Sequence, residues 1–250
     1  MQLLALDTST ETMSIAVQRP VDGQTRVWQH HAPGGAQTSS QLIPAIQALL
    51  AQAGLTIGQL DAIAFGCGPG SFTGLRTACS VAQGLAFGAA AHKPGGASTP
   101  VLPVDTLLAV AEEARFQQAF GTQQLQVLSL LDARMDEMYA GYYRYANGLW
   151  TQLEDFSLIR PQDLAPESGW LLAGNVWEAY GQRLPVGATG DLTTLPSASA
   201  MLRLAPQLLA HGAGIDPALA LPRYIRDKVA KTTHERAQER NLATPGKPSA

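Results

Sequence analysis

The 250-residue sequence predicts an α/β protein of two lobes, each built on a mixed β-sheet, with the second lobe reduced. Three observations predict this fold class. Short apolar runs typical of buried strands alternate with segments of helical periodicity. One arrangement of strands and turns occurs twice, at a constant offset of 125 residues. The composition, with 46% apolar and 15% charged residues, is that of a globular chain that buries a core.

The first lobe is predicted to begin with three strands joined by tight turns. Residues 3–6 form an apolar run that ends at Asp7, and residues 13–17 alternate as a half-buried strand does. Asp22-Gly23 is a two-residue hairpin signal that leads into a third strand at 25–30. These strands are therefore expected to be antiparallel neighbours.

Helices and further strands follow along the chain. A helix is predicted from about Ser39 to Gly54, because apolar residues recur on one face and a glycine can terminate it. Similar signals predict a strand at 61–67, a second helix that ends near residue 91, a strand at 101–104 and a helix at 106–115 capped by Asp105.

The repeat is the most informative feature of the sequence. Leu6-Asp7 corresponds to Leu131-Asp132, and the same offset carries Asp22-Gly23 onto Asn147-Gly148. A fixed-period match of this kind indicates duplicated units. The second copy then weakens: we predict a stub at 161–164, a strand at 170–173, a short helix at 176–183 and a last helix at 197–211.

We expect a first lobe at residues 1–104, a second lobe at 105–221 and a polar, partly disordered tail at 222–250. The helix at 197–211 is expected to pack back on the first lobe. Six Lys or Arg residues and three acids lie between Arg223 and Arg240. A solvated tail is the default interpretation, and contact with RNA or a partner is the alternative.

Bulk properties exclude several classes of protein. The net charge is −3, whereas a protein that binds nucleic acid by itself usually carries an excess of basic residues. Any nucleic-acid-binding role is therefore expected to be shared with a partner. Cys67 and Cys79 lack metal-ligand spacing and are expected to be buried thiols. We see no signal peptide and no apolar run of about 18 residues, and expect a soluble cytoplasmic protein without membrane segments.

Asp7, Thr8 and Ser9 stand where a nucleotide loop of such a fold would lie, since a tight turn can point backbone N–H groups at phosphate. The alternative is that these side chains only cap the turn. The corresponding loop after Asp132 lacks Gly, Ser and Thr, which indicates a degenerate site. We expect no catalytic or metal site and no tightly bound cofactor, with ATP bound weakly or at a subunit interface.

Residues 68–76, Gly-Pro-Gly-Ser-Phe-Thr-Gly-Leu-Arg, match neither the Walker loop nor the dinucleotide motif. The helix that follows is rich in Gly and Ala, which allows close approach to a partner protein or tight packing inside the chain. On the first interpretation the predicted partner interface comprises Gly70, Phe72, Thr73, Gly74, Leu75, Arg76, Ala78, Val81, Ala82 and Leu85.

Four motifs occur in one order: Leu6-Asp7-Thr8-Ser9, residues 68–76, Asp132-Ala133-Arg134, and Pro222-Arg223-Tyr224-Ile225-Arg226. Together they resemble the TsaB (YeaZ) family. The resemblance implies a duplicated actin/Hsp70/sugar-kinase (ASKHA) fold and a non-catalytic paralogue of the TsaD transferase.

The family resemblance also implies a scaffold or activator role in forming N6-threonylcarbamoyladenosine next to the anticodon of tRNAs that read codons beginning with A. Family members dimerise with TsaD, help recruit the TsaE ATPase, form homodimers when alone and meet tRNA indirectly, through the complex. This sequence has Thr38-Ser39-Ser40 where many relatives carry a His, and a longer tail, so contacts there are open.

Two other interpretations remain open. One is an enzyme of the same fold, either a small-molecule kinase or a glycoprotease-like hydrolase, for which Asp132 is the candidate acid. The other is a standalone homodimeric binding protein.

Overall fold

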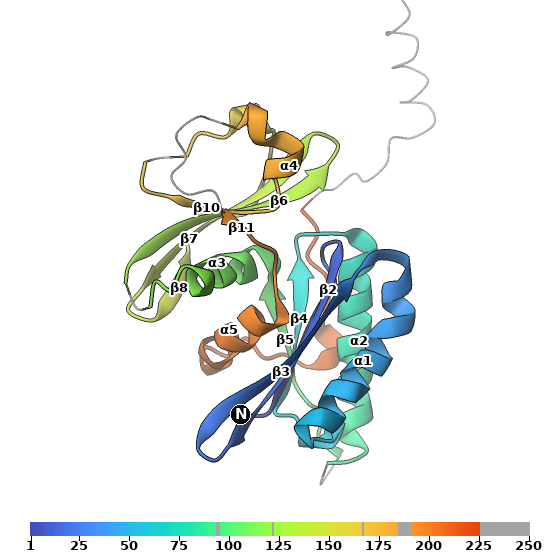
Figure 1. Cartoon of the computed structure of the whole chain (residues 1–250). Helices are drawn as coiled ribbons and strands as arrows, with labels where there is room; N and C mark the ends of the chain where they lie inside the picture. Colours follow the sequence, from blue (N-terminus) through green and yellow to red (C-terminus); the bar gives the residue numbers. More distant parts are fainter. Residues whose placement is uncertain (94–95, 122, 167, 185–191, 226–250) are drawn as a thin grey trace, which may run out of the picture.

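The computed structural model describes residues 1–225 except 94–95, 122, 167 and 185–191. The predicted tail lies almost wholly outside the described residues. The described chain forms two lobes, each with a mixed sheet, that stack one above the other (Figure 1). The predicted two-lobed α/β architecture is therefore confirmed.

The sheet of the first lobe has the order β3-β2-β1-β4-β5. β1 pairs antiparallel with β2 and parallel with β4, so the sheet is mixed. Helices α1 and α2 lie together on one face of this sheet (Figure 1). The elements are β1 Leu3–Asp7, β2 Thr12–Val21, β3 Gln24–Pro33, α1 Thr38–Ala53, β4 Ala62–Gly68, α2 Phe72–Ala90 and β5 Val101–Asp105, and α3 Thr106–Gln117 follows β5.

The sheet of the second lobe has the order β11-β10-β6-β7-β8, with β9 paired to β7. Read from β8, this order repeats that of the first lobe strand for strand. The elements are β6 Leu125–Arg134, β7 Glu137–Ala146, β8 Leu149–Gln152, β9 Ser157–Ile159, β10 Leu171–Gly174, α4 Trp177–Tyr180, β11 Leu192–Thr193 and α5 Ala198–Ala210. The duplication predicted from the sequence is confirmed.

The two hairpin turns have nearly the same backbone. Asp22 and Gly23 have φ values of 50° and 78°, and Asn147 and Gly148 have 53° and 83°. A two-residue turn with both φ values positive matches the twist of its flanking strands, and it favours Asn or Asp followed by Gly. The turn chemistry thus sets the register of both hairpins.

The reduced part of the second lobe departs from the predicted elements. The predicted helix at 176–183 is a single α-turn, α4, followed by a 3-10 turn at Gly181–Arg183. The stub predicted at 161–164 is a 3-10 turn at Pro161–Asp163, and β9 and β11 were not predicted. None of the helices in the described part of the chain is long and apolar enough to cross a membrane.

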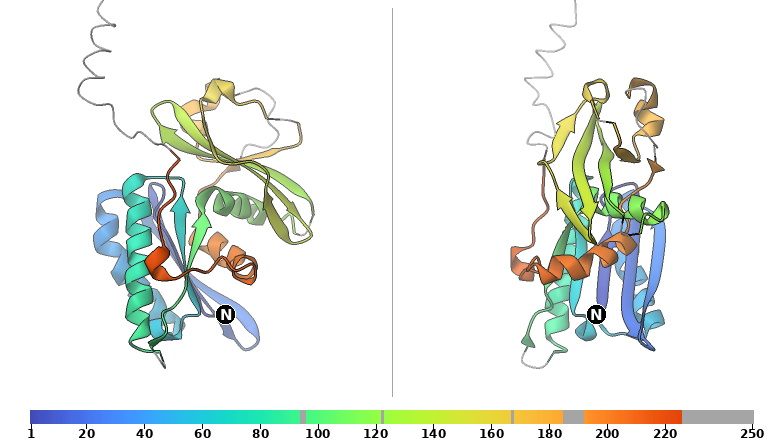
Figure 2. Two further views of the ribbon diagram at one scale, coloured as in Figure 1. Left: turned by 180° about the vertical axis from the view of Figure 1, so that it is seen from behind. Right: turned by 90° about the vertical axis from the view of Figure 1, so that its left-hand side faces the viewer.

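Helices α3 and α5 lie between the two sheets (Figures 1 and 2). One buried cluster contains Leu102 and Val110 of the first half together with Val127, Tyr143 and Met201 of the second. This shared core joins the lobes into one packed body. The lobe boundaries at 104 and 221 remain predictions.

A buried carboxylate connects these central helices. Glu112 of α3 accepts hydrogen bonds from Arg203 Nε of α5 at 2.8 Å, from Arg115 Nε at 2.8 Å and from Trp150 Nε1 of β8 at 2.9 Å. Burial alone would raise the pKa of Glu112, but the donated hydrogen bonds outweigh it and lower the pKa. A buried charge held by several donors fixes how α3, α5 and β8 meet. Near the start of α5, the Ala198 N–H donates to Ser14 Oγ of β2 at 2.9 Å.

Candidate functional site

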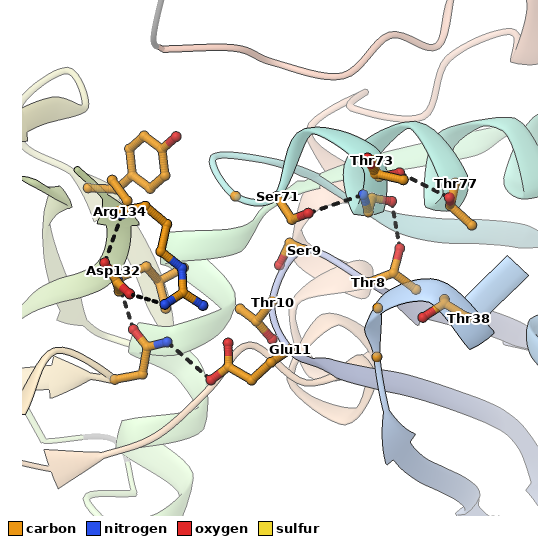
Figure 3. A pocket seen from close by; sticks show the side chains of 18 of the residues that line it. Thr8, Ser9, Thr10, Glu11, Thr38, Ser71, Thr73, Thr77, Asp132 and Arg134 are labelled. Atoms are coloured by element: carbon orange, nitrogen blue, oxygen red, sulfur yellow. Dashed lines mark hydrogen bonds and ion pairs between the residues drawn. The ribbon is translucent and has the colours of Figure 1, made fainter. Parts of the chain in front are cut away.

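A cleft of about 620 Å³ opens between the lobes. Residues 8–11, the start of α2 and residues 131–134 line it, together with Asn175. Figure 3 shows Thr8, Ser9, Thr10 and Ser71 on one side, with Asp132 and Arg134 facing them from the second lobe. The two loops that the repeat relates therefore meet across this cleft.

The first loop is tied tightly to the start of α2. Thr8 Oγ1 donates to the Gly74 carbonyl at 2.6 Å, and the Ser71 N–H donates to the Ser9 carbonyl at 2.7 Å. A Cβ atom at Gly70 would lie 2.6 Å from the Ser9 carbonyl oxygen, and one at Gly74 would lie 1.8 Å from that of Thr8. Two glycines of the 68–76 motif are thus required by close backbone approach.

Asp7 does not line the cleft. Its carboxyl group is fully buried beneath the loop, where Oδ1 accepts from the Ser9 N–H at 3.1 Å and from Ser9 Oγ at 2.8 Å. Oδ2 lies beside Gly66, where an added Cβ atom would come within 1.9 Å of it, and it has no hydrogen-bond partner among the described residues. Burial raises the pKa of Asp7 to about 7, against the lowering effect of the Ser9 hydrogen bonds.

Thr8 and Ser9 do line the cleft, but their hydroxyl groups donate to the Gly74 carbonyl and to Asp7. These bonds favour the turn-capping interpretation of the loop. Nucleotide binding by Asp7, Thr8 and Ser9 remains a prediction.

In the loop of the second lobe, the Asp132 carboxylate is also bound by other groups of the same chain. Asp132 Oδ1 accepts from Tyr180 Oη and from the Arg134 N–H, both at 2.8 Å, and Oδ2 lies 3.1 Å from Arg134 Nη1. Burial and the Asp132 carboxylate raise the pKa of Tyr180 to about 12. Sequence reasoning missed Tyr180, which lies 48 residues away and outside any motif.

Asn175 joins the lobes across the cleft. Its Oδ1 accepts from the Asp132 N–H at 2.9 Å, and its Nδ2 donates to Glu11 Oε1 of the first lobe at 3.4 Å. The sequence carries no signal for this contact, because Glu11 and Asn175 are 164 residues apart.

The hairpin between β6 and β7 has an unusual backbone. Arg134, Met135 and Asp136 have φ values of 62°, 56° and 67°. Three successive non-glycine residues in the left-handed region are uncommon, and such strain often marks functional segments. The turn leaves the Met135 side chain 60% exposed at the edge of the lobe junction.

A buried carboxyl also lies where β5 passes into α3. Asp105 Oδ1 accepts from the Leu107 N–H at 2.9 Å and caps α3 as predicted, and Oδ2 accepts from Tyr143 Oη of β7 at 2.9 Å. Burial raises the pKa of Asp105 to about 7 and that of the nearby Cys67 thiol to about 12. Among the described residues, no three His, Cys, Asp or Glu side chains gather as metal ligands do.

Helix α2 has two faces with different roles. Leu75, Ala78 and Ala82, which we predicted to contact a partner, are fully buried against the chain's own sheet. Val81 and Leu85 are half-buried, whereas Gly84 and Gly88 are exposed. The predicted contact residues of the first turn are exposed or half-buried: Gly70, Phe72, Thr73, Gly74 and Arg76. The internal-packing interpretation therefore holds for the inner face of the helix only.

Glycine on the exposed face is not explained by this chain's packing. A Cβ atom at Gly84 or Gly88 would meet nothing within 4 Å. Beside these residues a shallow groove runs from Ser39 at the start of α1 along α2 to Val81. A smooth, open helix face beside a groove is the kind of surface that accepts another helix closely.

Comparison with known proteins gives the family. The chain is 33% identical over 241 residues to the tRNA threonylcarbamoyladenosine biosynthesis protein TsaB of Escherichia coli, covering 92% of this chain and 96% of that protein. It is 35% identical to the protein of the same name from Haemophilus influenzae, covering 91% and 94%.

The chain belongs to the TsaB family.

Two further matches agree with this TsaB-family assignment. The solved structure of YeaZ from Pseudomonas aeruginosa superposes with a TM-score of 0.75 at 36% identity, covering 90% of this chain and 99% of that chain. A family model described as "TsaD: tRNA N6-adenosine threonylcarbamoyltransferase" matches residues 26–239. The expected resemblance to the TsaB (YeaZ) family and the ASKHA-like fold are confirmed.

Proposed function

We propose that this chain acts in tRNA threonylcarbamoyladenosine biosynthesis as a non-catalytic scaffold subunit that dimerises with the TsaD transferase and helps recruit the TsaE ATPase. The pathway follows from the names of its relatives. The scaffold role rests above all on the open glycine face of α2. In this proposal the subunit forms a homodimer when alone and meets tRNA through the complex.

Glycine in a helix interior is less favourable than alanine by about 0.5–1 kcal/mol. Gly74 offsets this by allowing Thr8 to approach, but Gly84 and Gly88 have no such neighbour. An external helix packed against α2 would explain both. We therefore assign the partner surface to the exposed stripe of Thr73, Ser80, Gly84, Phe87 and Gly88.

The state of the two loop carboxylates supports the non-catalytic part of the proposal. Asp7 is buried beneath its own loop, and both oxygens of Asp132 are engaged by Tyr180 and Arg134. A general base or metal ligand must have an oxygen available to the substrate or ion. Three of these four oxygens are engaged by the protein itself, and the fourth, Asp7 Oδ2, has no hydrogen-bond partner in the described part of the chain but is buried away from the cleft.

The test is reconstitution of threonylcarbamoyl transfer to unmodified tRNA with the transferase and the ATPase, with and without this protein. We expect product only when it is present, and no ATP turnover by the protein alone. Gly84→Leu should abolish binding to the transferase, because the leucine side chain fills the helix face. The control must be a site where an added side chain causes no backbone strain, which excludes Gly23 with its φ of 78°. Ala210→Leu, at the end of α5, tests whether an added side chain elsewhere is tolerated.

An enzyme of the same fold is the second candidate, favoured by the polar cleft of about 620 Å³. One structural neighbour is described as a protein with similarity to peptidase YEAZ. Hydrolysis of ATP or of a peptide by the isolated protein, abolished by Asp132→Ala, would establish this candidate and remove the scaffold proposal.

A further inference from the structure

The C-terminal described residues build a cluster of arginines and aromatic rings at the lobe junction. The rings of Phe72 and Tyr224 lie 5.1 Å apart, and the Arg76 guanidinium lies 3.9 Å above Phe72. Arg76 Nε also donates to Tyr224 Oη at 2.9 Å. Both rings stay partly open to solvent, with 40% of Phe72 and 43% of Tyr224 exposed.

The chain segment that carries Tyr224 is firmly placed. The Arg223 N–H donates to the Cys67 carbonyl at the end of β4 at 2.7 Å. The Arg223 side chain reaches the second lobe, where its guanidinium lies 4.2 Å above Phe156 and 3.8 Å from Asp155. The cluster is therefore a built surface that both lobes share.

A pocket of about 250 Å³ opens beside this cluster. Its walls include Phe72, Tyr139 and Tyr224, with Arg134 and Arg223, and none of its lining residues is acidic. This is notable in a chain with a net charge of −3. The volume lies below the range of roughly 300–1,000 Å³ typical of cofactor-sized ligands, so the pocket suits a single ring system.

Exposed rings beside arginines are the features by which proteins hold unpaired nucleotides. Bases stack on aromatic side chains and on guanidinium planes, while arginines contact the phosphates. An acidic peptide would use the arginines but gains little from two open rings. The described chain ends at Ile225 on the rim of this pocket, and residues 226–250 contain six Lys or Arg and three acids.

We propose that this junction surface, formed by Phe72, Arg76, Arg134, Arg223 and Tyr224, binds an unpaired nucleotide of the tRNA directly. The inference rests on the proposed function, which supplies tRNA as the ligand. It adds a direct contact to the indirect one expected for this subunit. One base stacks on the Phe72–Tyr224 pair, and the arginines hold its flanking phosphates.

The test measures the affinity of the assembled complex of this protein, the transferase and the ATPase for unmodified tRNA. Phe72→Ala and Tyr224→Ala should each weaken binding by about fivefold or more, the effect of losing one stacked base. Phe116→Ala is the matched control, because Phe116 is also exposed beneath an arginine, Arg203, at 4.1 Å. It should leave affinity within about twofold.

Two further variants separate stacking from folding and from charge. Tyr224→Phe keeps the ring but loses the hydroxyl, and should bind tRNA as the parent does. Arg223→Ala should lower the slope of log affinity against log salt by about one, and Arg26→Ala, at a distant exposed site, should not.

Unchanged tRNA affinity in both ring variants overturns the inference and leaves the proposed function intact, provided that product still forms. Loss of the transferase from the complex in these variants also overturns it, since the cluster is then a protein interface. Failure of the proposed function is recognised separately, by product formation when this protein is omitted.

Discussion

Adding a methyl group at Gly84 and at Gly74 should have opposite effects on stability. At Gly84 the new Cβ meets nothing within 4 Å, so the helix gains the propensity difference of about 0.5–1 kcal/mol. At Gly74 the Cβ would lie 1.8 Å from the Thr8 carbonyl oxygen and must displace backbone. Overpacking of this kind costs about 3 kcal/mol.

The assay is urea unfolding of the isolated protein, with a thermal melt as a second measure. The double variant Gly84→Ala and Gly88→Ala should gain about 1–2 kcal/mol, which corresponds to a rise in Tm of roughly 2–8 °C for a chain of this size. Gly74→Ala should lower Tm by about 6–12 °C on the same scale. The measurements should span protein concentrations at which a homodimer dissociates.

Binding supplies the second half of this prediction. If a partner helix packs on α2, the Gly84→Ala variant should be more stable when alone yet bind the transferase less tightly. A Gly84→Ala variant that is destabilised refutes the interpretation that this face of α2 has room for an added side chain. A variant that is stabilised but binds as before refutes the assignment of that face to the partner.

Three further predictions concern the core and the cleft. Burial raises the pKa of Asp7 from 3.8 to about 7, so between about pH 4 and 7 the folded state holds a proton that the unfolded state has released, and the free energy of unfolding falls as the pH rises. Asp7→Asn should remove up to about 4 kcal/mol of that decline, measured by urea unfolding at several pH values. Glu112→Gln should destabilise the protein by about 3 kcal/mol, measured by urea unfolding, because Arg115 and Arg203 share this buried carboxylate and only Arg203 keeps a second one, Glu113; no loss would contradict that role. Asn175→Ala should speed amide hydrogen exchange of the 131–134 loop, and unchanged exchange would show that the contact with Glu11 does not hold the lobes.

Much of the fold was predictable because its signals are local. The Asp22-Gly23 and Asn147-Gly148 turns have the backbone that their residues favour, and the equal offset predicted the second sheet from the first. The short elements of the second lobe were harder to predict. Strands of two or three residues, such as β9 and β11, have too few positions to show a period.

The site was less predictable because it depends on contacts distant in sequence. Glycine and alanine differ little in hydropathy, so the pattern of α2 did not distinguish the buried Ala78 and Ala82 from the open Gly84. The resemblance to a nucleotide loop at Asp7 also did not show that its carboxyl turns inward. That orientation depends on the space left by Gly66.

The position of α5 has a consequence for synthesis on the ribosome. This helix packs beside β1 and β2, and its N-terminus donates to Ser14, yet it is made about 100 residues after the first lobe's strands. At 5–20 residues per second, β1 and β2 wait on the order of 10 s without the helix that covers them on this face. Nascent chains of this protein are therefore expected to need a chaperone during that interval.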